Sequence, residues 1–289
     1  MNLAIWLERT AARHPNRQAI FLGSECLATY KEFWLAVCAL RSHLENEGIK
    51  PGDRVAVYMR NCPEYLIAFY GIWSMGAVIL PINSKLHTKE VGWILENAGC
   101  SYVLCEESSI NEINFPGVTV FNPKWQQFDT NIHIPPVKRS SNDLAWLFYT
   151  SGTTGRPKGV MITHGMIKTM ALSYFADVDQ VHPSDTTLYA APMSHGAGLY
   201  SIMHVLAGAR HAIPVSGGFD EEEIFGLAET LQNVHMFAAP TMVKRLTTFS
   251  RKNGYDGDGI RTIVYAGGPM YLSDIIEAVE QFGSLFIQV

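Results

Sequence analysis

The residue types best suited to chemistry are gathered in one polar segment, Tyr149 to Gly159, which reads Tyr-Thr-Ser-Gly-Thr-Thr-Gly-Arg-Pro-Lys-Gly. Its glycines allow successive backbone N–H groups to point into one concavity, and its hydroxyl side chains add further hydrogen-bond donors. Lys158 adds a mobile positive charge. This composition suits the β- and γ-phosphates of a nucleotide. The predicted phosphate-binding residues are Thr150, Ser151, Gly152, Thr153, Thr154, Gly155 and Lys158.

This segment does not match the common P-loop, which requires glycine, four residues, and then Gly-Lys-Ser/Thr. Counting from Gly152, Pro157 stands where the second glycine is needed, and Gly159 stands where a magnesium-binding hydroxyl should be. The alternative interpretation is an ordinary solvated turn. The length and order of the run favour a phosphate-binding loop.

Two other segments have residues suited to a binding site. His195 lies in the run Ala191-Pro192-Met193-Ser194-His195-Gly196-Ala197-Gly198, which follows a predicted strand. A lone histidine is often a buried core residue whose ring nitrogens are already hydrogen-bonded, but the surrounding glycines leave open space beside this one, which favours a binding site. Gly267, Gly268 and Pro269 follow the predicted strand 262–264, and glycines at a strand's carboxyl end let a flat base approach the backbone. Alone, Gly-Gly-Pro is simply a turn.

Strands and helices alternate along the chain in the manner of an open α/β fold. We place a subdomain boundary in the proline-containing stretch 106–142, which gives a first α/β subdomain at 1–142 and a second at 143–289. Buried strand 144–149 precedes the polar loop, and regular structure is expected to restart at 160–162 with Thr163 at a helix cap, so that the loop is presented rigidly. The other expected elements are helix 30–47, strand 54–59, a helix capped by Asn61, strand 77–80, a helix from Thr88 to Asn97, strand 102–105, helix 165–175, strand 187–191, a helix capped by Asp220, and strand 262–264.

The polar segment resembles, nearly residue for residue, the signature of the adenylate-forming superfamily of acyl-CoA synthetases, aryl-CoA ligases and peptide-synthetase adenylation domains. Further landmarks extend the resemblance along the chain, at residues 28–33, 48–55 and 76–83. The chain looks closest to fatty-acid and other acyl-CoA ligases. The resemblance implies the N-terminal part of the large domain, with two helix-flanked, mostly parallel sheets in stacked subdomains and no C-terminal cap domain.

The resemblance also implies a reaction and its cofactors, which are ATP, Mg²⁺ and coenzyme A. A carboxylate attacks the α-phosphate of ATP, pyrophosphate leaves, and a thiol, most often that of coenzyme A, attacks the acyl-adenylate. Thr150 through Thr154 and Lys158 would hold pyrophosphate, His195 would help to place the acid, and Gly267, Gly268 and Pro269 would border the base. The implied catalytic residues are His195 and Lys158, and a weaker assignment places the acyl group near Gly196, Gly198, Met236 and Ala238.

The sequence departs from the family pattern after Leu285–Val289, where the family continues with Tyr-Gly-x-Thr/Ser-Glu. The glutamate that helps to bind magnesium, the ribose-binding aspartate and the C-terminal catalytic lysine are not in this sequence, so no metal ligand is expected within it. We therefore expect the N-terminal portion of a longer synthetase that has little or no ligase activity alone. Association through the surface left by the missing part, or homo-oligomerisation, is a further expectation.

Two alternatives to an acid:CoA ligase remain open. The first is adenylation for a carrier protein or of an amino acid. Amino-acid adenylation domains usually carry Phe-Asp-x-Ser near the position of Met193–Gly196, and the missing acid disfavours an amino-acid substrate. The second is a non-catalytic fragment that binds nucleotide weakly or self-associates.

Composition narrows the protein classes. The 289 residues are 47% hydrophobic, with a formal charge of −5. The sequence has no cluster of basic residues that would indicate binding to nucleic acid or to an anionic membrane. The uncharged stretch Tyr65–Ile82 contains Gly71, Gly76 and Pro81, which favour a soluble helix and strand over a membrane span. The N-terminus lacks a secretion signal, and the five cysteines show no metal or redox spacing, so we expect a cytoplasmic protein.

Overall fold

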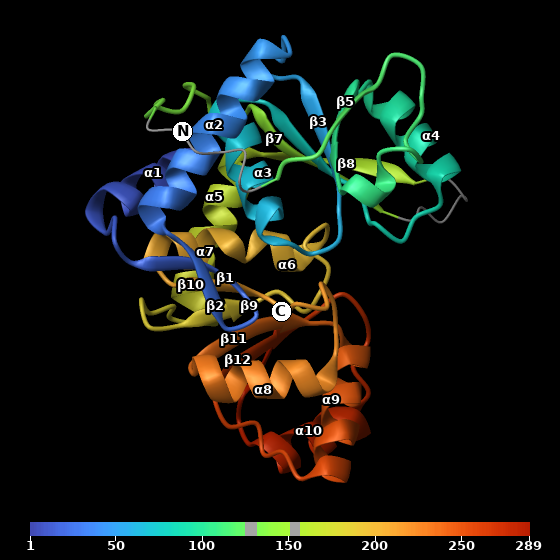
Figure 1. Cartoon of the computed structure of the whole chain (residues 1–289). Coiled ribbons are helices and arrows are strands. Elements are labelled where there is room, and N and C mark those ends of the chain that lie inside the picture. Colours follow the sequence, from blue (N-terminus) through green and yellow to red (C-terminus); the bar gives the residue numbers. More distant parts are fainter. Residues whose placement is uncertain (125–131, 151–156) are drawn as a thin grey trace. The chain divides into compact units, whose positions relative to one another are not determined.

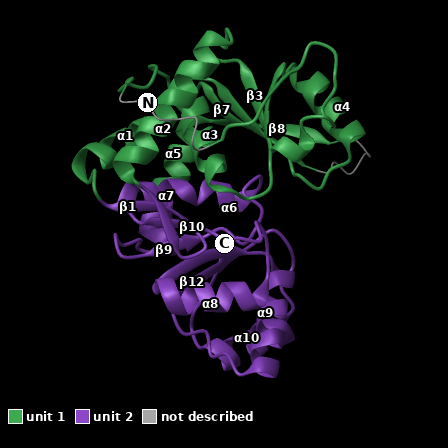
Figure 2. Cartoon of the chain, in the orientation of Figure 1, with its two compact units in different colours: residues 1–16, 29–172 green, residues 17–28, 173–289 purple. Residues whose placement is uncertain are grey.

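The computed structural model describes residues 1–124, 132–150 and 157–289, which form two compact units. Unit 1 contains residues 1–16 and 29–172, and unit 2 contains residues 17–28 and 173–289 (Figure 2). Each unit has a mostly parallel sheet with helices on its faces, which confirms the predicted α/β class (Figure 1). The expected boundary after residue 142 differs from this division, because residues 144–163 pair with the first sheet and residues 18–28 belong to unit 2.

The sheet of unit 1 has the strand order β6-β5-β3-β4-β7-β8, in which the paired strands are parallel except for antiparallel β7 and β8. Its elements are α1 (Ala4–Arg13), α2 (Tyr30–Asn46), β3 (Arg54–Tyr58), α3 (Pro63–Met75), β4 (Val78–Pro81), α4 (Thr88–Ala98), β5 (Tyr102–Cys105), the short η1 (Glu107–Ser109), β6 (Thr119–Phe121), β7 (Leu144–Thr150), β8 (Lys158–Thr163) and α5 (His164–Ser173).

The expected elements of unit 1 are present, but two helix caps were assigned one residue away from their true positions. Helix α3 is preceded by Cys62 rather than Asn61, and α4 is capped by the His87 side chain rather than by Thr88. The apolar stretch 65–82 contains most of α3, which ends at left-handed Gly76, and β4, and nearly all its side chains are buried. Among the described residues, no helix combines the length and apolarity needed to cross a membrane.

The sheet of unit 2 has the strand order β13-β12-β11-β9-β10-β1-β2, and the pairings from β13 to β1 are all parallel. Its elements are β1 (Gln18–Leu22), β2 (Glu25–Thr29), a π-helical turn η3 (Tyr174–Val178), β9 (Thr186–Leu188), α6 (Gly196–Leu199), α7 (Ser201–Ala207), β10 (Arg210–Ile213), α8 (Glu221–Leu231), β11 (Val234–Ala238), α9 (Pro240–Asn253), β12 (Ile260–Tyr265), α10 (Leu272–Phe282) and β13 (Phe286–Gln288).

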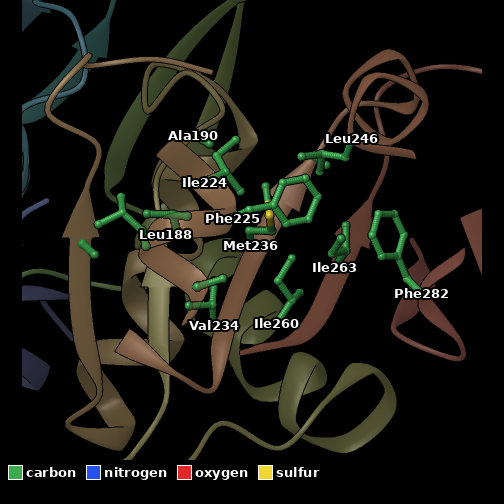
Figure 3. Close-up of a cluster of buried hydrophobic side chains, with 14 of the residues drawn as sticks. Leu188, Ala190, Ile224, Phe225, Val234, Met236, Leu246, Ile260, Ile263 and Phe282 are labelled. Atoms are coloured by element: carbon green, nitrogen blue, oxygen red, sulfur yellow. The ribbon is translucent and has the colours of Figure 1, made fainter. Parts of the chain in front are cut away.

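Two sets of helices pack against the sheet of unit 2. Helices α8, α9 and α10 build one hydrophobic core with alternate residues of the strands, including Met236 of β11 and Ile263 of β12 (Figure 3). Helix α6 contacts β11, and α7 contacts β9 and β10. The expected cap of α8 is confirmed, since Asp220 Oδ1 accepts a hydrogen bond of 2.9 Å from the Glu223 N–H. The strand expected at 187–191 is shorter, because the backbone leaves the sheet after Leu188.

Candidate functional site

The strand order of unit 2 contains a topological switch point at β9. The chain passes from β9 to its neighbour β10, and then crosses to β11 on the other side of β9. Connections that leave in opposite directions open a crevice beyond the carboxyl ends of β9 and β11, which is where open α/β sheets bind ligands. The segment after β9 contains His195 and Gly196, and the segment after β12, the other neighbour of β11, contains Gly267 and Gly268.

His195 lies in the segment that follows β9, in extended backbone immediately before α6. Its Nδ1 is 2.9 Å from the hydroxyl oxygen of buried Ser194, and its backbone N–H donates to Pro192 O at 3.1 Å. If the Ser194 hydroxyl donates to Nδ1, the ring proton lies on Nε2, where it can be donated to a carboxylate. The residue is exposed as a whole, yet nearby protein atoms displace enough water from the ring to lower the pKa of His195 below its ordinary 6.5.

Gly196 brings the backbone against the ring of Phe237 in β11. A Cβ atom at Gly196 would lie 3.2 Å from Phe237 Cζ, which is tighter than ordinary contact. The half-buried Phe237 ring packs on Tyr200 with centroids 5.2 Å apart, and Tyr200 packs edge-on against Tyr174 at 5.5 Å. We call Phe237 and Tyr200 the aromatic wall. An apolar group next to Gly196 would contact this wall.

The structure does not place Met236 and Ala238 beside Gly196, as the weaker sequence assignment expected. Both are fully buried in the core formed with α8, α9 and α10 (Figure 3). Successive residues of a strand point to opposite faces, so Phe237 faces away from that core. Phe237 lies on the side where it meets Gly196, while Gly198 stays within α6, next to buried Ala197.

Gly267 and Gly268 form an exposed and open surface after β12. Gly267 has φ +85°, and no atom lies within 4 Å of a Cβ built on it. A Cβ on Gly268 would be 3.9 Å from the nearest atoms, in the Pro240 ring. The Ala266 N–H donates to Ala238 O at 3.2 Å, which joins this segment to the end of β11. Pro269 is exposed as well. Such a surface can accept a flat ring against the backbone.

The described residues of the predicted phosphate loop are in unit 1. Thr150 ends β7 and Lys158 begins β8, and the two are opposite partners in the antiparallel pair; both are exposed. Ser151, Gly152, Thr153, Thr154 and Gly155 lie outside the described residues. Tyr149, the residue before Thr150, is held in place, since its hydroxyl donates to Asn97 Oδ1 at 2.6 Å and its ring covers Gly159, where a Cβ would lie 3.0 Å from Tyr149 Cζ.

Lys158 is an exposed cation in unit 1, and the Gly267 backbone is an open surface in unit 2. Within the ranges that the structure describes, no group of three or more His, Cys, Asp or Glu side chains could hold a metal ion. The acidic start of α8 is engaged elsewhere, because Glu221 pairs with Arg245 at 2.7 Å and Glu223 accepts the backbone N–H groups of Val215 and Ser216.

Comparison with known proteins decides the family. Residues 7–289 match the family model described as AMP-binding enzyme. The chain belongs to this family. It is 28% identical to feruloyl-CoA synthase from Amycolatopsis sp over 290 residues, which cover 99% of this chain and 58% of that protein. It is also 28% identical to the long-chain-fatty-acid–CoA ligase FadD13 from Mycobacterium tuberculosis, covering 97% of this chain and 59% of the ligase. The chain thus spans somewhat over half the length of these relatives.

A more distant relative and two solved structures complete the comparison. Surfactin synthase subunit 2 from Bacillus subtilis is 26% identical over 97% of this chain and 8% of its own length. The inhibitor-bound N-terminal domain of FACL13 from Mycobacterium tuberculosis has a TM-score of 0.85 and 27% identity, covering 99% of this chain and 74% of that one. VinN in complex with L-aspartate has a TM-score of 0.87 over 100% of this chain and 74% of its own, but only 22% identity, so it supports the fold alone.

Sequence reasoning missed the aromatic wall. Tyrosine and phenylalanine often occur in protein cores, and neither Tyr200 nor Phe237 lies in a recognisable motif. The available signal was the alternation of side chains along β11, which forbids neighbouring Met236 and Phe237 from facing the same side.

Proposed function

We propose that this chain supplies acid- and nucleotide-binding groups of an enzyme that activates a carboxylic acid as an acyl-adenylate and transfers the acyl group to coenzyme A. The observation that carries the proposal is the convergence of His195 and Gly196 with Phe237 at the switch point of unit 2, beside the open Gly267–Gly268 surface. A cytoplasmic location belongs to the same proposal.

The roles of the residues follow from their chemistry. The carboxylate oxygen bonds to the α-phosphorus while the bond to pyrophosphate breaks, and the thiol later attacks the acyl carbon and releases AMP. His195 would donate from Nε2 to the acid, which orients its oxygen for attack. Thr150, Ser151 to Gly155 and Lys158 would hold the leaving pyrophosphate, and Gly267, Gly268 and Pro269 would border the base. Mg²⁺, when bound, would neutralise phosphate charge; we assign it no ligand in this chain.

We infer an apolar acid as the substrate. The segment 192–198 has no acidic side chain, and the aromatic wall lies beside Gly196. An amino-acid ammonium group placed there would lose its hydration without gaining a nearby counter-charge from that segment. The similarity to feruloyl-CoA synthase and to a long-chain-fatty-acid–CoA ligase supports the same class of substrate.

The similarity to surfactin synthase subunit 2 supports a second candidate, in which the acyl group is passed to a carrier protein. The two candidates share the adenylation step and differ in the acceptor thiol. Product analysis with coenzyme A, and separately with a phosphopantetheine-bearing carrier protein, distinguishes them.

Pyrophosphate exchange into ATP tests the adenylation step. The full gene product that includes this chain, supplied with ATP, Mg²⁺ and a panel of fatty, aryl and amino acids, should catalyse exchange with apolar acids and form their coenzyme A thioesters. Exchange that depends only on amino acids would contradict the apolar site. The 289-residue chain by itself should show little or no exchange.

A further inference from the structure

Three fully buried histidines lie on the face of the unit 2 sheet that is opposite the core of Figure 3. His204 belongs to α7, His211 to β10 and His235 to β11. Their strand neighbours Ala212 and Met236 point into that core, which places His211 and His235 on the other face. The ring centroids of His204 and His235 are 4.9 Å apart, and those of His204 and His211 are 6.4 Å apart. We call these three residues the histidine cluster.

The cluster is joined to the aromatic wall through Tyr200. His204 Nδ1–H donates to Tyr200 O at 2.8 Å, because a carbonyl can only accept. Tyr200 connects α6 to α7, and its ring lies between Phe237 and Tyr174. Tyr174 is itself fixed, since its hydroxyl is 2.8 Å from His235 Nε2, which is 3.1 Å from Asp179 Oδ2.

We propose that His204 is a positioning residue for the acid site, which holds Tyr200 and thereby keeps the aromatic wall in place beside Gly196. The role of the wall in binding an acid rests on the proposed function, whereas its positioning by His204 does not. Every link in the path is a contact between described residues: His204 with Tyr200, Tyr200 with Phe237, and Phe237 with Gly196.

The surroundings of His204 make this positioning sensitive to acid. The rings of His211 and His235 lie against the His204 ring, and Tyr174 packs on His235. Arg261 acts on His204 electrostatically, and its cation is paired with Asp179 and Asp185. Burial lowers the pKa of His204 well below its ordinary value, and burial lowers the pKa of His211 to about 3. A proton on His204 would therefore be an additional cation in a fully buried site.

The direction of the effect follows from linkage. Closed α6–α7 keeps His204 neutral, and an opened segment would bind a proton at an ordinary histidine pKa of about 6.5. Opening is therefore favoured progressively as the pH falls below that value. At pH 5 the opening equilibrium of this segment should be about 30-fold larger than at pH 8.

The test is hydrogen exchange of residues 196–207 in the 289-residue chain between pH 8 and pH 5, corrected for intrinsic exchange rates and referenced to α8. His204→Asn keeps an N–H donor near the position of Nδ1 and does not titrate, so its corrected exchange rate should change less with pH across this range than that of wild type. His211→Asn is the matched control, because His211 bonds Tyr189 instead of Tyr200, and it should retain the wild-type dependence.

Wild-type opening that is flat with pH, or a His204→Asn variant with the same pH dependence as wild type, overturns the proposal. If that variant does not fold, the wild-type profile alone decides. Octanoate is the binding probe: its affinity, compared at each pH between wild type and His204→Asn, should fall faster with acid in wild type. Octanoate that binds neither protein would contradict the apolar acid site, while the exchange result would still decide the role of His204.

Discussion

Met236 and Phe237 are adjacent in β11 but belong to different environments. Met236 is fully buried with the side chains of α8 and α9, while half-buried Phe237 lies against Gly196 and Tyr200. The strand thus separates a residue that stabilises the fold from a residue that can contact a ligand. Substitution at the two positions should therefore have different consequences.

Truncation of each side chain tests this separation. Met236→Ala should lower the free energy of unfolding by roughly 2–5 kcal/mol through the cavity that it leaves. Phe237→Ala should cost less stability and should shift the preference of the full enzyme towards bulkier acids, because the wall beside Gly196 recedes. Denaturant unfolding measures the first effect, and kcat/KM for acids of graded width measures the second. An unchanged acid preference in Phe237→Ala would remove Phe237 from the site.

The sequence alone could not predict which side chains of β11 face the core. Val-His-Met-Phe-Ala is largely apolar on both faces, so alternation alone does not tell which residues face the core. Residues far along the chain, in α8, α9 and α10, determine it. Many strands and helices of unit 1 were predictable, because glycine and proline mark their ends locally, but β1, β2, β10, β11, α9 and α10 were not among the expected elements. The crossing from β10 past β9 to β11 is a long-range property of the sheet.

His195 should titrate below an ordinary histidine. Nearby protein atoms lower its pKa, so the neutral ring persists to lower pH than in an ordinary histidine. The measurement is the NMR titration of the His195 ring protons, with a midpoint expected below 6.5. His195→Ala should weaken acid binding by roughly 10- to 100-fold, as for the loss of a hydrogen bond to a charged group.

His195→Gln is the conservative variant, since its amide can donate from near the position of Nε2, and it should recover part of that affinity. Exposed His182 is the matched control, and His182→Ala should bind the acid normally. A midpoint above 6.5, or equal binding by His195→Ala and wild type, would contradict the assigned role.

Lys158 should contribute to the reaction with ATP but not to the stability of the fold. Its side chain is exposed at the start of β8, so Lys158→Ala should leave the unfolding midpoint nearly unchanged. Loss of its charge should reduce pyrophosphate exchange by the full enzyme roughly 100-fold or more, since the charge of the leaving group is less well stabilised. Lys168→Ala, at an exposed lysine of α5, controls for the general loss of positive charge. Similar exchange rates in the two variants would exclude a specific contact between Lys158 and phosphate.

Gly254 and Gly259 offer a matched pair for the fold of unit 2. Their φ angles are +79° and +80°, so alanine is strained to the same extent at either position. No atom lies within 4 Å of a Cβ on Gly254, whereas a Cβ on Gly259 would lie 2.0 Å from the backbone oxygen of Ala228 in α8. Gly259 therefore allows the segment before β12 to pass directly against the end of a helix.

Gly254→Ala should cost about 1 kcal/mol, from the left-handed conformation alone. Gly259→Ala should cost roughly 3 kcal/mol or more, because two backbone segments must separate and the adjoining core is disturbed. Urea unfolding of the 289-residue chain, monitored by circular dichroism, measures both. The difference between the two losses in the free energy of unfolding measures the cost of the close backbone approach alone, because the conformational strain is the same in both variants. Equal losses would mean that α8 and the segment before β12 do not approach each other this closely. The packing of α8 at this edge of the core in Figure 3 would then be wrong.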